Sequence, residues 1–226
     1  MRYGSILLSF RINLKTTLKS IYYFSLGFGF TSIIKLAQIK KGPLLELKKI
    51  IFLKIKQYFV DNPIKLGGPN IIVQIDETKL NFNVKNHRGR NIPACWALVI
   101  VDNFFVPALR YSVIFENRSA EVLLYIINQI VIPRSVIVTD EWKSYSSLSE
   151  LNIYQHQTVC HKYCFVDRNT GTHTQNVKSY NNKLRLAIKK TKGLNLEQRK
   201  VFLQEFLYRE HHSNDKFTSL IKLFEF

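Results

Sequence analysis

The sequence predicts an α/β fold in which helices flank a mixed β-sheet and a helical segment comes first. Four apolar, strand-like runs lie between residues 70 and 140. The breaks between the second and third runs are short, which indicates antiparallel pairing. The fourth run follows an amphipathic helix and is therefore expected to lie parallel to its neighbour. Before the strands, residues 1 to about 60 carry apolar side chains at helical spacing.

The composition favours a folded, DNA-associated chain. It has 226 residues with 33 Lys and Arg against 16 Asp and Glu, a formal charge of +17. This length suits one core domain with a smaller appendage, which we divide into residues 1–62 and 63–226. The apolar content is ample for a packed core and argues against wholesale disorder. The charge favours a polyanionic partner such as DNA, although a genome that favours Lys, Asn and Ile would also produce it.

The N-terminal segment reads as two helices with a break. "TSIIKLAQIKKGPLLELKKIIFLKIKQYF" has helical periodicity interrupted at Gly42-Pro43, and Thr31 is a candidate N-cap. Two helices joined by a Gly-containing turn are typical of a helix-turn-helix, but an ordinary helical hairpin has the same pattern. The apolar stretch "SIYYFSLGFGFTSII" is short for a membrane span and contains Ser and Gly, so we expect no membrane association.

The remaining elements follow a linker-like stretch, "DNPIKLGGPN". The expected strands are "NIIVQIDE", "CWALVIVDN", "VPALRYSVIF" and "SVIVTD". "SAEVLLYIINQIV" reads as a helix capped by Ser119, with Pro133 just past its end. A polar loop is expected at 160–171, then a helix over 175–191 and a last helix in "LEQRKVFLQEFLYRE". The apolar stripe of the 175–191 helix consists of Val177, Tyr180, Leu184 and Ile188.

Two aspartates stand at informative places in this order of elements. Asp76 lies within the first strand, and Asp140 ends the fourth. In a ribonuclease-H-like fold these two strands are central neighbours, so the two acids would project side by side. Paired carboxylates repel unless a cation lies between them, and Mg²⁺ prefers such oxygen ligands. The alternative for each Asp alone is a turn or helix-capping role.

Several segments together resemble a known family. "GGPNIIVQIDET", "NHRGRNIPACWALVIVD", "VIVTDEWKSYSSL", "CHKYCFVD" and "GTHTQNVKSYNNKLR" occur in this order. They resemble the DDE transposase domain of Merlin-type elements and related bacterial insertion sequences, the ISXO-like transposase domain, over roughly residues 65 to 210. The resemblance implies a ribonuclease-H-like fold and metal-dependent cleavage and transfer of DNA strands at the ends of a transposable element. It matches Asp76 and Asp140 to the first two catalytic, metal-binding aspartates.

The third acidic position departs from the family pattern. The family has an acidic or other polar ligand in the stretch that matches "NVKSY", and the matching residue here is Lys178. Arg185 fills the basic place expected seven residues later, so both side chains would face the site. A protonated Lys cannot bind Mg²⁺. Either the protein is a decayed or repurposed transposase that still binds DNA, or an amide oxygen replaces the acid, or the register is shifted. The candidate amide donors are Gln175, Asn176 and Asn181.

Other side chains are candidates for contact with DNA, each with a simpler alternative. His173 fits the family pattern but would also suit a hydrogen-bonded loop. Trp142 and Tyr145 would stack on bases or else pack in the core. Cys160, His161 and Cys164 suggest zinc, but no fourth ligand is evident and core-facing thiols are favoured. The basic candidates, which would otherwise be solvated or favoured by a helix dipole, are Arg88, Arg90, Lys178, Arg185, Lys189 and Lys190.

The function expected from the sequence is a transposase-like domain that acts on DNA with Mg²⁺ or Mn²⁺, or a decayed copy of one. The alternative is a catalytically inactive, transposase-derived DNA-binding protein. Whether the chain is an enzyme therefore depends on the effect of Lys178. The resemblance implies a homo-oligomer on DNA, located in the nucleus if the organism is eukaryotic and otherwise in the cytoplasm.

Overall fold

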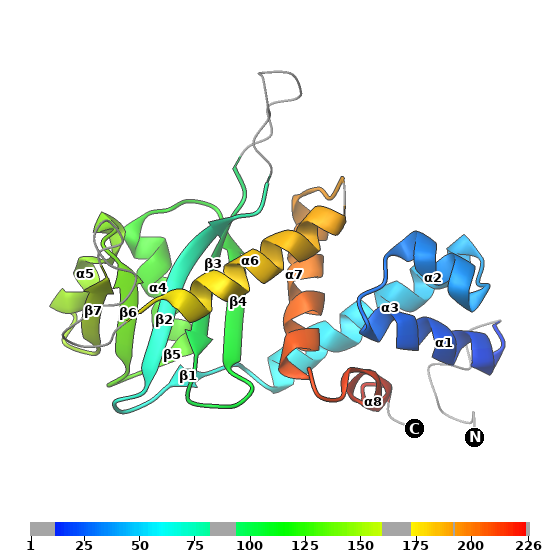
Figure 1. The fold of residues 1–226 in the computed structure, drawn as a ribbon, viewed down its shortest axis with the longest axis horizontal. Coiled ribbons are helices and arrows are strands. Elements are labelled where there is room, and N and C mark those ends of the chain that lie inside the picture. Colours follow the sequence, from blue (N-terminus) through cyan, green and yellow to red (C-terminus); the bar gives the residue numbers. More distant parts are fainter. Residues whose placement is uncertain (1–11, 82–93, 160–172, 192, 225–226) are drawn as a thin grey trace, which may run out of the picture. The chain divides into compact units, whose positions relative to one another are not determined.

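The structure is a computed structural model that describes residues 12–81, 94–159, 173–191 and 193–224 (Figure 1). The chain forms two compact units. One is Ile64–Leu203, and the other combines Met1–Pro63 with Gln204–Phe226. The last residues thus group with the N-terminal helices, whereas the sequence-based division kept them with the sheet. The sequence-based division into functional domains at residues 1–62 and 63–226 stays a prediction.

The unit Ile64–Leu203 is built on a five-stranded mixed sheet with the strand order β4-β3-β2-β6-β7. Strands β2, β3 and β4 pair antiparallel, while β6 pairs parallel with both β2 and β7. This arrangement confirms the predicted ribonuclease-H-like fold class. The strands are β2 (Ile72–Lys79), β3 (Trp96–Asp102), β4 (Leu109–Phe115), β6 (Val136–Asp140) and β7 (Gln155–Val159). A second, two-stranded parallel sheet joins β1 (Leu66–Gly67) to β5 (Val131–Ile132).

Helix α4 (Ala120–Ile130) covers one face of the five-stranded sheet. The Ser119 hydroxyl accepts a hydrogen bond from the Val122 N–H, as the predicted N-cap requires. One stripe of the helix is buried with the alternate strand residues that point toward it. The core formed here includes Val73, Ile75, Leu98, Ile100, Leu123, Ile127 and Ile137.

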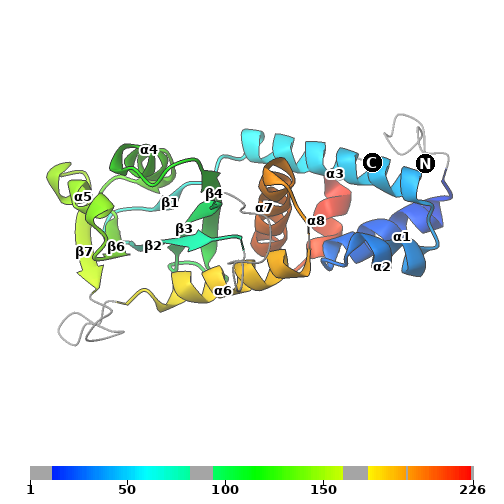
Figure 2. The same ribbon diagram turned by 90° about the horizontal axis from the view of Figure 1, so that it is seen from above.

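Helix α6 (Gln175–Lys190) lies on the opposite face of the sheet, as Figure 2 shows. Its buried residues include all four members of the predicted apolar stripe. They pack on the side chains of β2 and β3 that alternate with those facing α4. The sheet is therefore buried on both faces near its centre, which explains why β3 is apolar along nearly its whole length.

Strand β7 was not predicted from the sequence. Its residues, "QHQTV", are mostly polar and partly exposed, because β7 forms an edge of the sheet. Between β6 and β7 lie two short helical turns, η3 (Lys143–Tyr145) and α5 (Ser147–Glu150). The predicted loop at 160–171 lies outside the described residues, as do Cys160, His161 and Cys164.

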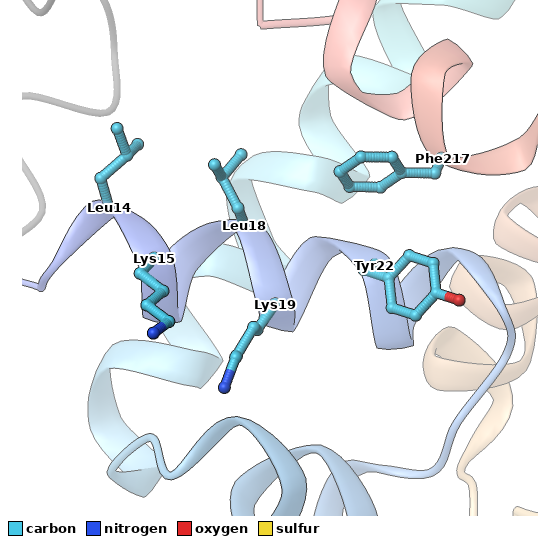
Figure 3. Close-up of a pocket in the computed structure, with 6 residues that line it drawn as sticks. All are labelled: Leu14, Lys15, Leu18, Lys19, Tyr22 and Phe217. Atoms are coloured by element: carbon cyan, nitrogen blue, oxygen red, sulfur yellow. The ribbon is translucent and has the colours of Figure 1, made fainter.

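The other unit has its own helical core. It contains α1 (Leu14–Ser25), α2 (Phe30–Ala37), α3 (Lys41–Asp61) and α8 (Lys216–Lys222), while α7 (Leu196–His211) begins in one unit and ends in this one. Helix α3 buries a stripe at spacings of three and four residues, namely Leu44, Leu47, Ile51 and Ile55. A shallow, mainly apolar pocket lies beside α1, with Phe217 on its wall (Figure 3).

Two sequence-based details of these helices were wrong. The predicted break at Gly42-Pro43 does not exist, because both residues lie in the first turn of α3, where a proline breaks no hydrogen bond. The chain turns earlier, through the left-handed residue Gln38. Thr31 lies inside α2, which is capped by Gly29. None of the helices in the described ranges is long and apolar enough to cross a membrane.

Candidate active site

Asp76 and Asp140 lie on one face of the sheet, on adjoining strands. In the parallel pairing of β2 with β6, Gln74 is opposite Val138. Two residues further along each strand, the side chains return to the same face, and these residues are Asp76 and Asp140. The structure thus brings together the two acids that the sequence singled out.

The environment of Asp76 opposes its ionisation. Its pKa is raised from 3.8 to about 6, first by burial and then by the negative charge of Asp140. Three smaller effects act in the other direction: the charge of Lys178 and hydrogen bonds from the Glu77 N–H and the Asn181 amide. The effects that raise the pKa outweigh those that lower it, so the Asp76 carboxylate has too little positive charge nearby.

Helix α6 contributes both an amide and a cation to the same place. Asn181 is buried, and its Nδ2 donates to Asp76 Oδ2 at 3.0 Å. Its Oδ1 is also buried and accepts no hydrogen bond among the described residues. Lys178 lies three residues earlier, on the same helix face, and its charge acts on Asp76. Arg185 is exposed and donates to Asn182 on its own helix.

Gln74, which the sequence did not identify, fixes the start of α6 on the sheet. This side chain is 2% exposed, and its Oε1 accepts from the backbone N–H groups of Asn176 and Val177, both at 3.1 Å. Its Nε2 lies 3.2 Å from His173 Nδ1, which also accepts from the Gln175 N–H. A strand amide therefore satisfies the N–H groups that a helix leaves unpaired at its N-terminus. His173 is held by hydrogen bonds, and its contact with DNA stays a prediction.

Glu77 points to the face opposite Asp76, as strand alternation predicts, but it has a structural role that the sequence did not reveal. Its carboxylate accepts from the Tyr145 hydroxyl and, at 3.0 Å, from the Arg118 guanidinium. Arg118 is 41 residues away in sequence, so no local pattern pairs them. Tyr145 is buried in the core with Trp142 packed beside it, which supports the core-packing interpretation of these aromatics.

The remaining basic candidates lie apart from this centre or outside the description. Lys189 and Lys190 are exposed in the last turn of α6. Arg88 and Arg90 lie outside the described residues. Their contacts with DNA stay predictions.

The donor atoms suit a hard divalent cation. Two carboxylates and the free Asn181 oxygen form an oxygen-only set of the kind that Mg²⁺ and Mn²⁺ prefer. No group of three or more His, Cys, Asp or Glu residues that could hold a metal occurs in the described part of the chain. The residues therefore fit a cation only if the amide replaces a third carboxylate.

A ribonuclease-H-like sheet with two aspartates on its central parallel strands defines the class of this domain. The model of the family described as "ISXO2-like transposase domain" matches residues 65–211, well over half of the chain. The chain belongs to this family.

Solved structures with low identity also resemble the chain. One is a chain of the simian T-cell lymphotropic virus intasome in complex with the PP2A regulatory subunit B56 gamma (16% identity, 83% of this chain and 67% of that chain, TM-score 0.38). Another is the HTLV-2 integrase catalytic core domain in complex with magnesium (16%, 61% and 84%, TM-score 0.33). A third is a pre-cleavage Mos1 transpososome (9%, 92% and 78%, TM-score 0.28). No curated protein matches the chain.

Proposed function

We propose that this chain acts on DNA as a transposase-type domain that cleaves and transfers strands by metal-dependent phosphoryl transfer. The observation that carries the proposal is the placement of Asp76 and Asp140 on one face of adjoining strands. Membership of a transposase family supports the DNA substrate. The charge of +17 supports it independently, because Lys and Arg neutralise phosphates.

Each residue of the site has a distinct part in this proposal. Asp76 and Asp140 hold the cation, and the buried Asn181 oxygen completes the set in place of a third acid. A bound Mg²⁺ or Mn²⁺ would activate the attacking oxygen and stabilise the leaving one. Asp76 must lose its proton before it binds the cation, so cation binding is expected to weaken as the pH falls below about 6. Arg88, Arg90, His173, Arg185, Lys189 and Lys190 would contact DNA.

The second candidate function is DNA binding without catalysis, and Lys178 favours it. Its positive charge acts on Asp76, and its place in the motif is the one where the resemblance implies a metal ligand. A cation there competes with the metal for the same carboxylate, while it would still attract a phosphate. In both cases we propose a homo-oligomer on DNA, in the nucleus of a eukaryote or otherwise in the cytoplasm.

A nicking assay on supercoiled plasmid with Mn²⁺ distinguishes the two candidates. Catalysis predicts nicking by the wild type that is lost in Asp76→Ala and Asp140→Ala. The second function predicts no nicking, salt-sensitive DNA binding, and nicking gained in Lys178→Glu. Lys183→Glu is the matched control, since Lys183 is an exposed residue of the same helix. Absence of DNA binding at low salt would exclude both functions.

A further inference from the structure

The turn that follows Asp140 is fastened to β2 through one arginine. Arg118 lies just before α4, and its guanidinium carbon is 4.1 Å from the centroid of the Trp96 ring and 3.9 Å from that of Trp142. Cation–π contacts of this kind are strongest where water is excluded. The cation lies between an aromatic side chain of β3 and one of the turn after β6, although the Arg118 side chain is still 37% exposed.

The same guanidinium is also bound to β2. It donates to Glu77 Oε2 at 3.0 Å, and the Glu77 side chain is only 4% exposed. The Tyr145 hydroxyl donates to the other carboxylate oxygen, and Ser144 Oγ donates to the Arg118 carbonyl at 3.3 Å. The Glu77 carboxylate has a fixed position, because loss of Arg118 would leave its charge without a counter-charge and loss of the Tyr145 hydroxyl would leave one of its oxygens without a donor.

This assembly ends on a proposed metal ligand. The Trp142 N–H donates to Asp140 Oδ1 at 3.0 Å, and the Tyr145 N–H donates to the Trp142 carbonyl at 3.0 Å. Glu77 is the chain neighbour of Asp76 and points to the other face of β2. Arg118 therefore joins the residue next to Asp76, Glu77, to a residue just after Asp140, Trp142. In the described structure it touches neither aspartate carboxylate.

We propose that Arg118 is a positioning residue that sets the placement of Asp140 relative to Asp76. It acts by clamping Trp142 and the turn after β6 onto Glu77. The expected effect of Arg118 on metal affinity rests on the proposed metal-binding function. The contacts that Arg118 makes with Glu77 and Trp142 can be tested without metal. A purely stabilising arginine would change the stability of the whole unit and leave the folded site unaltered.

Arg118→Lys is the central variant, because lysine keeps the charge but loses the planar fork that stacks and donates at once. The full chain is used. The first measurement is metal-free amide hydrogen exchange by NMR. We expect the Trp142 amide to exchange at least tenfold faster in the variant, while the Ile75 and Leu184 amides stay within twofold of the wild type. The second is Mn²⁺ titration followed by electron paramagnetic resonance, with the dissociation constant expected to rise at least tenfold.

Arg110→Lys is the matched control. The Arg110 guanidinium carbon lies 5.3 Å from the centroid of the Tyr180 ring in the same unit. We expect its Trp142 exchange and Mn²⁺ affinity to stay within twofold of the wild type. If Arg118→Lys does not fold, Tyr145→Phe replaces it, since this change removes only the hydroxyl from Glu77; both effects are then expected at about threefold.

The outcomes separate the clamp from the metal function. A folded Arg118→Lys protein with wild-type Trp142 exchange overturns the proposal. So does faster exchange with unchanged Mn²⁺ affinity in a protein that binds Mn²⁺. If the wild type binds no Mn²⁺ but Trp142 is loosened selectively, the clamp is supported and the proposed metal function fails.

Discussion

The surroundings of Asp76 oppose the negative charge of its side chain. A carboxyl with a pKa raised from 3.8 to about 6 binds more protons in the folded state than in the unfolded state between these values. The neutral form therefore contributes stability that is complete below about pH 4 and is lost as the pH rises through about 6. At neutral pH the ionised side chain destabilises the metal-free fold, as is common for groups kept for function.

Replacement of Asp76 by Asn tests this account. At about pH 7.5 Asp76→Asn is expected to unfold with a free energy higher than that of the wild type, by at most about 3 kcal/mol. Near pH 4 the difference should fall below about 1 kcal/mol, because the wild-type carboxyl is then almost fully protonated in the folded state and roughly half protonated in the unfolded state. Urea unfolding in metal-free buffer at both pH values measures it.

The control for this experiment is Asp61→Asn, which removes one exposed carboxylate at the end of α3. Its effect should stay within about 0.5 kcal/mol at both pH values. A destabilised Asp76→Asn at neutral pH would contradict the raised pKa.

At the scale of elements, α6 is attached to the sheet at its first turn by Gln74. The backbone N–H groups of Asn176 and Val177 both depend on this one amide. Because Asn181 and Lys178 lie within the next two turns, the position of Gln74 also determines where they meet Asp76.

Removal of the Gln74 amide should therefore loosen α6. Gln74→Leu fills a similar volume but leaves two N–H groups without their partner, at an expected cost of about 2–4 kcal/mol. Urea unfolding measures the loss, and amide exchange at Val177 should rise most. Gln155→Leu, on the exposed edge strand β7, should cost less than about 0.5 kcal/mol. Equal effects of the two changes would exclude a capping role.

The sequence predicted those elements whose pattern follows from burial. β2, β3, β4, β6, α4 and α6 each bury an apolar run or stripe, and that burial leaves a period in the sequence. β7 was missed because an edge strand buries little and needs no apolar alternation. The Asp pair was predictable from its place on the strands. Gln74 and Arg118 were not, because their partners come from distant segments that only the fold brings together.

For the whole molecule, the excess of positive charge is the property that bears most on DNA. If Lys189 and Lys190 contact phosphates, each contact releases counterions, so the dependence of affinity on salt counts them. Both residues are exposed in the last turn of α6.

The double change Lys189→Gln and Lys190→Gln is expected to weaken binding of a short duplex uniformly across sequences. The slope of log affinity against log salt should fall in magnitude by about 2. Filter binding at several salt concentrations measures this slope. Lys65→Gln is the control, since the Lys65 ammonium already donates to the Gln129 carbonyl at 2.6 Å, and its slope change should be below about 0.5. An unchanged slope in the double variant would remove the end of α6 from the DNA-binding surface.

The chain contains two tryptophans, and both of them flank Arg118. Fluorescence excited at wavelengths that tyrosine does not absorb therefore comes from the two tryptophans beside Arg118. The native tryptophans are therefore an intrinsic fluorescent reporter near Asp76 and Asp140. A change in their emission when a ligand is added can be assigned to that part of the molecule without an attached dye.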